Sequence, residues 1–74
     1  MINLLRDTII QYVEVDPASI IETTSFVEDL HLNSYEIISI VGSVENDLGI
    51  DFPESDIRQM RTVGDVIEYI NNKS

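Results

Sequence analysis

The amino-acid sequence predicts an all-α fold, a small four-helix bundle with three longer helices, one short helix and a long first loop. Apolar residues recur at helical spacing in three separate segments, and two of these segments open with residues that can form a capping box. No segment alternates apolar and polar residues for long enough to predict a strand. Since the chain has 74 residues, we expect a single domain over residues 1–74.

The first helix is predicted over residues 3–14. Leu5, Ile9 and either Tyr12 or Val13 recur at helical spacing, and Asn3 can cap the N-terminus of the helix. The pattern therefore predicts about three turns of amphipathic helix.

A long ordered loop is predicted between the first helix and Asn33. It opens with Asp16 and Pro17, which are typical of the start of a short helical turn, and this turn is predicted to continue through Ile20 and Ile21. Beyond that turn, Phe26 and Leu30 are large apolar residues that need burial. Loops of this length are uncommon in small domains and are usually functional, so we expect this loop to shape a site.

The main helix is predicted over residues 34–48. Asn33 can cap its N-terminus, and Glu36, three positions on, can reach back to the Asn33 amide, as in a capping box. Gly49 fits a left-handed C-terminal cap. These boundary signals predict that Ser34 is the first fully helical residue.

Two further helices are predicted over residues 54–60 and 63–71. The first is short and follows Pro53, and the second opens with Thr62 and Asp65, which resemble a second capping box. The apolar positions of the helices and the loop predict a core of Leu5, Ile9, Phe26, Leu30, Ile37, Ile40, Val41, Val44, Leu48, Ile57, Val63, Val66, Ile67 and Ile70.

Ser34 is the candidate functional residue. Its hydroxyl is expected to lie close to unpaired backbone N–H groups and the positive end of the helix dipole. A phosphate ester is electrostatically favoured at such a position. Spacing alone does not show that Ser34 is modified, because serine is common at helix starts.

The outward face of the main helix is a candidate docking surface. Tyr35, Ser39 and Gly42 fall on the stripe opposite the predicted core, and Ile38 lies at the edge between the two faces. Glycine within a helix is unfavourable by up to about 1 kcal/mol relative to alanine. Gly42 therefore indicates that a neighbour packs closely there.

Composition excludes several classes of function. The formal net charge of −10, from 14 acids and 4 bases, argues against nucleic-acid binding, which needs clustered lysine and arginine. No stretch reaches the roughly 18 to 20 apolar residues of a membrane span, and Arg6 and Asp7 interrupt the N-terminal apolar run too early for a signal peptide. We therefore expect a cytoplasmic monomer that neither binds nucleic acid nor inserts into membranes.

Catalysis and metal binding are not predicted either. The chain has no cysteine, and His31 is its single histidine, without a nucleophile or an orienting group placed beside it. Residues 47–51 lack the ligand spacing of a calcium loop. We expect His31 to be a solvated loop residue and the protein not to be an enzyme.

The order of these motifs resembles that of the acyl carrier proteins. Residues 25–30 (Ser-Phe-Val-Glu-Asp-Leu) match the stretch before the modified serine of that family, and residues 31–35 (His-Leu-Asn-Ser-Tyr) stand at its Gly-x-Asp-Ser-Leu motif. Residues 49–53 and 62–65 match the segment that leads into its last helix. The similarity covers essentially the whole chain, and the spacing of the motifs is more specific than the serine motif alone.

The resemblance implies a carrier with a covalent cofactor. A phosphopantetheinyl transferase would attach 4′-phosphopantetheine from coenzyme A to Ser34, with Asn33, Tyr35 and Glu36 as the flanking recognition residues. The terminal thiol of the arm would carry acyl groups as thioesters for fatty acid, polyketide or another specialised acyl biosynthesis. The partners implied are the acyl-activating, condensing and tailoring enzymes of that pathway.

Departures from the family motif favour a specialised pathway at least as much as general fatty acid synthesis. Asn33 replaces an aspartate, Tyr35 a leucine or methionine and His31 a glycine, while Ser39 and Gly42 stand where the family has an acid and a large apolar residue. An unmodified interaction module of the same fold stays open as an alternative. So does an aminoacyl or peptidyl carrier, although the absence of a Gly-Gly-x-Ser motif favours a carboxylic acyl cargo.

Three bulky residues bear on the length of the acyl cargo. Phe52, Ile57 and Met60 are bulky where the short third helix should cover the space beside the main helix. These side chains predict limited room for a long buried chain.

Overall fold

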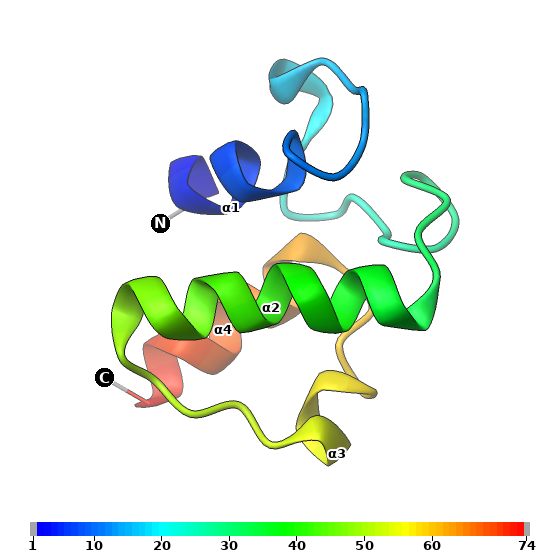
Figure 1. Cartoon of the computed structure of the whole chain (residues 1–74). Helices are drawn as coiled ribbons and strands as arrows, with labels where there is room; N and C mark the ends of the chain where they lie inside the picture. The colour runs from blue at the N-terminus through cyan, green and yellow to red at the C-terminus, as the bar shows by residue number, and fades with distance from the viewer. Residues whose placement is uncertain (1, 74) are drawn as a thin grey trace.

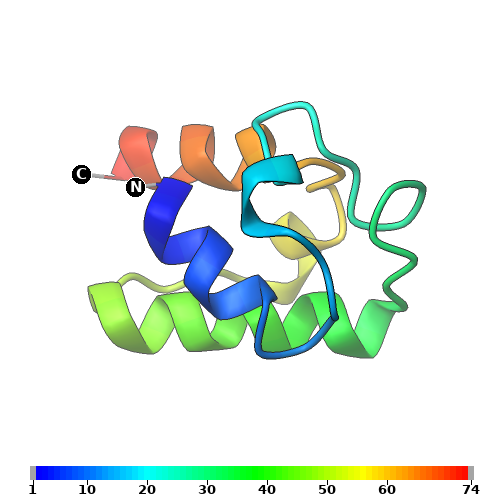
Figure 2. The ribbon, with the colours of Figure 1, turned by 90° about the horizontal axis from the view of Figure 1, so that it is seen from above.

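The computed structural model describes residues 2–73 and shows an all-α fold, as predicted. Its helices are α1 (Ile2–Ile9), α2 (Ser34–Leu48), α3 (Glu54–Ile57) and α4 (Val63–Lys73). In Figure 1, α2 crosses in front of α4, with α1 above it and α3 below it. α1 packs against both α2 and α4, and Figure 2 shows it lying between them, while α3 packs against α2.

α1 ends at Ile9, so the prediction of a helix over 3–14 is wrong at its C-terminal end. The Tyr12 amide donates to the Ile9 carbonyl at 2.9 Å, an i to i−3 bond that tightens the chain into turns. The Tyr12 hydroxyl lies 3.2 Å from the Ser43 hydroxyl and 3.4 Å from the Ser39 carbonyl of α2. Contacts with α2 thus accompany the early end of the helix.

The short helical turn predicted after Asp16 is found as the 3-10 helix η1 (Pro17–Ser19). The Asp16 side chain accepts a hydrogen bond from the Ala18 amide at 2.9 Å, as expected of an N-cap. The turn ends before Ile20, earlier than predicted. Ile20 is fully buried, and its carbonyl accepts a hydrogen bond from the Arg6 guanidinium at 2.9 Å, which fastens the start of the loop to α1.

The bounds of the last two helices also differ from the prediction. α3 ends at Ile57 instead of residue 60, because the Met60 amide turns back to the Ile57 carbonyl at 3.0 Å and the Met60 side chain enters the core. α4 continues to Lys73, two residues past the predicted end. The bounds of α2 coincide with the predicted 34–48.

The core contains most of the predicted residues and several from the loops. Ile37, Leu48 and Ile67 are only partly buried and pack against the buried core. The short helices leave the ends of the bundle open, and apolar residues outside the helices close them. These additional buried side chains are Ile20, Leu32, Phe52 and Met60.

Backbone hydrogen bonds tie the long loop to the start of α4. The Val63 amide donates to the Thr24 carbonyl at 3.0 Å, and the Gly64 amide donates to the Glu22 carbonyl at 2.8 Å. A Cβ atom at Gly64 would lie 2.9 Å from that carbonyl oxygen. Glycine at this position therefore allows the loop to approach the helix closely.

Gly42 has no such neighbour, which corrects the expectation of close packing. A Cβ atom added there would meet nothing within 4 Å. The glycine is thus not required by packing within the chain.

The two glycines predict stability changes of opposite sign. Gly64→Ala should lower the free energy of unfolding by about 1–3 kcal/mol, because the methyl group would push against backbone. Gly42→Ala should raise it by about 0.4–1 kcal/mol, because alanine loses less conformational freedom on folding. Urea denaturation of both variants measures the changes, and shifts in the same direction would contradict this account.

Candidate functional site

The N-terminus of α2 has the predicted capping box. The Asn33 Oδ1 atom accepts a hydrogen bond from the Glu36 amide at 2.9 Å, and a Glu36 carboxylate oxygen accepts one from the Asn33 amide at 3.1 Å. Ser34 is the first residue of α2 and is exposed. Its hydroxyl makes no hydrogen bond with the described part of the chain, so it is free to react.

The segment before Ser34 is fixed by buried leucines and a side-chain cap. Leu30 and Leu32 enter the core, and the Leu32 amide donates to the Phe26 carbonyl at 2.9 Å. At the start of the segment, the Asp29 carboxylate accepts a hydrogen bond from the Ser25 amide at 2.7 Å. The loop therefore holds the start of α2 in place.

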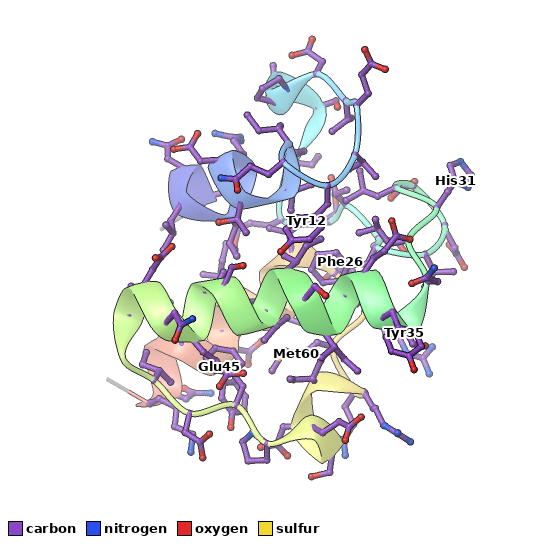
Figure 3. The ribbon with its side chains drawn as sticks, in the orientation of Figure 1. Tyr12, Phe26, His31, Tyr35, Glu45 and Met60 are labelled. Atoms are coloured by element: carbon purple, nitrogen blue, oxygen red, sulfur yellow. The ribbon has the colours of Figure 1, made fainter. Side chains whose placement is uncertain are left out.

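His31 has a backbone role that the sequence analysis missed. Its φ of 56° is the left-handed conformation, in which histidine is uncommon but tolerated. This turn allows the leucines on both sides of His31 to point into the core. The side chain itself is exposed, and Figure 3 shows it pointing away from the bundle, as expected of a solvated loop residue. The sequence did contain a signal for this left-handed turn, because histidine stands where the family motif has glycine.

A groove of about 550 Å³ lies beside Ser34, between the long loop, the first turns of α2 and the segment around α3. Ile37 and Ile38 of α2 line it together with Ile57 and Met60. Ile37 was predicted to be a core residue, and its position on the groove explains why it is only partly buried. Arg58 and Arg61 also line this groove, and the sequence analysis did not single them out.

The predicted docking residues lie on different parts of the α2 surface. Tyr35 is 85% exposed, and Figure 3 shows it at the N-terminal end of α2. Ile38 is half-buried and lines the groove. Ser39 is exposed, but its carbonyl lies near the Tyr12 hydroxyl, and Gly42 is half-buried one turn further on. Tyr35 is therefore the most accessible of these side chains.

Tyr69 holds α3 against α4, a contact that the sequence analysis missed. Its hydroxyl donates to the Asp56 carboxylate at 2.8 Å, and its ring centroid lies 4.7 Å from that of Phe52. The hydrogen bond to Asp56, together with burial and nearby acids, raises the pKa of Tyr69 from 10.0 to about 12. Because the same short helix carries Ile57, this contact also supports one wall of the groove.

Alkaline pH should weaken the hydrogen bond between the Tyr69 hydroxyl and the Asp56 carboxylate. Since the pKa of Tyr69 is raised in the folded state, its stabilising effect is fully present below about pH 10 and is lost as the pH rises through about 12. Thermal unfolding of the wild type and Tyr69→Phe should therefore differ at pH 8 and converge towards pH 12. A difference that stays constant over this range would contradict the assignment.

Comparison with known proteins identifies the family. The model of the family described as phosphopantetheine attachment site matches residues 3–70. An acyl carrier protein of Chlamydia muridarum is 35% identical over 69 residues, covering 93% of this chain and 90% of the relative. One from Lactobacillus acidophilus is 33% identical over 70 residues, covering 95% and 88%.

This chain has a small helical bundle, an exposed serine at the start of α2 and a match to the attachment-site family. Together these features define it as a phosphopantetheine-dependent carrier domain. The chain belongs to the acyl carrier protein family. The cofactor of this family is 4′-phosphopantetheine, which is attached covalently. Within residues 2–73, no helix has the length and apolar character needed to cross a membrane.

Proposed function

We propose that Ser34 is the attachment residue and that the protein carries acyl groups as thioesters. The observation that carries this proposal is the position of the Ser34 hydroxyl, which is exposed at the first turn of α2 and at the edge of a groove. Ser34 lies inside the stretch that matches the attachment-site family. When bound, the cofactor supplies a thiol that forms the thioester with the cargo.

The first turn of α2 suits a phosphodiester. In the attachment reaction the Ser34 oxygen bonds to the pantetheine-side phosphorus of coenzyme A, adenosine 3′,5′-bisphosphate leaves, and the hydroxyl proton passes to a base of the transferase. The capping box occupies the Glu36 amide but leaves the amides of Ser34 and Tyr35 without a hydrogen-bond partner among residues 2–73. These amides and the helix dipole favour the negative charge of the product.

The chain itself is proposed to tether the cargo and not to catalyse its chemistry. Its partners would be a phosphopantetheinyl transferase and the acyl-activating, condensing and tailoring enzymes of one pathway, in the cytoplasm and with the carrier as a monomer. Fatty acid, polyketide and other specialised acyl pathways all fit this role. Tyr35 in place of a leucine or methionine favours a dedicated set of partners.

Replacing Ser34 tests the attachment directly. Ser34→Ala should keep the fold, because the side chain is exposed, and should abolish the mass increase on incubation with coenzyme A and a broad-specificity transferase. Ser55→Ala is the matched control, since it removes another exposed hydroxyl, on α3 and outside the predicted docking surface, and it should still be modified. Intact-mass spectra decide the matter. An adduct on Ser34→Ala, or none on the wild type, would overturn the assignment, and the second result would favour an unmodified interaction module.

Docking is proposed to use apolar contact around Tyr35. Truncation of an aromatic anchor typically weakens binding by about 2 kcal/mol or more, whereas exposed charges act mainly on the association rate. Tyr35→Ala should therefore weaken binding to a cognate enzyme more than Glu36→Gln or Glu45→Gln does. Titrations at low and moderate salt should agree closely, and a steep salt dependence would indicate electrostatic docking instead.

A further inference from the structure

The groove beside Ser34 carries a local charge opposite to that of the whole protein. Arg58 and Arg61 line it together with a single acid, Glu28, which gives two positive charges against one negative. The chain as a whole has a net charge of −10 and only 4 bases. Half of the basic residues thus border the same groove as Ser34.

Neither guanidinium in the groove is committed to holding the fold. Arg58 pairs with Glu54 at 3.4 Å, but the two side chains are 74% and 61% exposed, so the pair contributes little. Arg61 takes part in the fold through its backbone, since its amide donates to Asp65 at 2.8 Å. The Arg61 guanidinium makes no hydrogen bond or ion pair with residues 2–73.

The other two basic residues, Arg6 and Lys73, do have side-chain partners within the fold. The Arg6 guanidinium donates to the Ile20 carbonyl at 2.9 Å and to the Asn3 side chain at 3.2 Å. The Lys73 ammonium lies 5.4 Å from the centre of the Tyr69 ring. The bases outside the groove therefore have partners within the chain, whereas those inside it keep their guanidinium groups available for an external anion.

The anion that this position fits is a phosphodiester on Ser34. Such a group would add a negative charge to an acidic protein, near Glu28 in the groove and Glu36 in the first turn of α2. Repulsion from these carboxylates needs a compensating cation. Guanidinium groups bind phosphate oxygens through paired N–H donors, which makes arginine well suited to this task.

We propose that Arg58 and Arg61 form an anion-binding site that holds the phosphodiester of the modified Ser34 against the groove. This inference rests on the proposed attachment of phosphopantetheine to Ser34. Arg61 supplies an unpaired guanidinium, and Arg58 exchanges its exposed contact with Glu54 for the phosphate. The root of the arm is thereby held at the groove.

The test compares the apo and modified forms of the wild type, Arg58→Gln, Arg61→Gln and the double variant. Lys73→Gln is the matched control, because it removes one positive charge outside the groove. Intact mass first establishes that each protein is modified. Melting temperatures and the arginine Nε–H signals in NMR spectra are then recorded for both forms.

Modification should shift the Nε–H signals of Arg58 and Arg61 but leave that of Arg6 unchanged. The difference in melting temperature between the modified and apo forms should be lower by about 2–4 °C in each arginine variant than in the wild type, and by more in the double variant. Lys73→Gln should match the wild type. The effect should also shrink at high salt.

Two results would overturn the proposal while the attachment itself stood. One is an equal effect of modification in the wild type and the double variant, with no shift of the arginine signals. The other is a shift of the arginine Nε–H signals that appears when the arm carries a succinyl group but not when the arm is free or carries a butyryl group. The anion bound by the arginines would then be the carboxylate of the cargo, not the phosphodiester. Absence of any adduct on the wild type would instead refute the proposed function, and this inference with it.

Discussion

The position of Ser34 depends on how the long loop is fixed to the rest of the chain. A bundle of short helices leaves its ends open, and the loop closes one of them by burying Phe26, Leu30 and Leu32. Backbone bonds to the start of α4 hold the same loop from the other side. Since α2 begins two residues after Leu32, this packing also sets where the exposed hydroxyl emerges. The close approach at Gly64 is a necessary part of that arrangement.

The parts of the fold that the sequence predicted well depend on residues close together in the chain. The capping box of Asn33 and Glu36 and the left-handed Gly49 involve neighbours within one turn, so their patterns can be recognised directly. The early end of α1 involves Tyr12 and Ser43, which are 31 positions apart, and no local pattern indicates that contact. Four further buried residues outside the helices were missed as core residues, because helical periodicity does not describe loops; they are Ile20, Leu32, Phe52 and Met60.

For the candidate site, too, local features could be predicted and long-range ones could not. Ser34 could be singled out because a helix start has a recognisable chemistry, and the order of motifs placed it in a known family. The sequence placed Ile57 and Met60 beside the main helix, but the shape of the groove could not be predicted. It is formed by a loop, the start of α2 and a segment around α3 that is distant from both in the sequence. The net charge was also a poor guide to local electrostatics, since a total of −10 does not reveal that Arg58 and Arg61 line the same groove.

One wall of the groove, formed by α3 and the residues that follow it, has little stability of its own. α3 spans only Glu54–Ile57, too short for its own hydrogen bonds to make it stable. What holds it is packing against the rest of the fold: its own Ile57 and the following Met60 are buried in the core, and Tyr69 of α4 donates a hydrogen bond to Asp56. The wall that carries both arginines is therefore positioned by α4, whose first turn also anchors the loop that forms the opposite wall. A change in the packing of α4 would move both walls relative to Ser34, so the geometry of the site depends on a helix that contributes no residue to it.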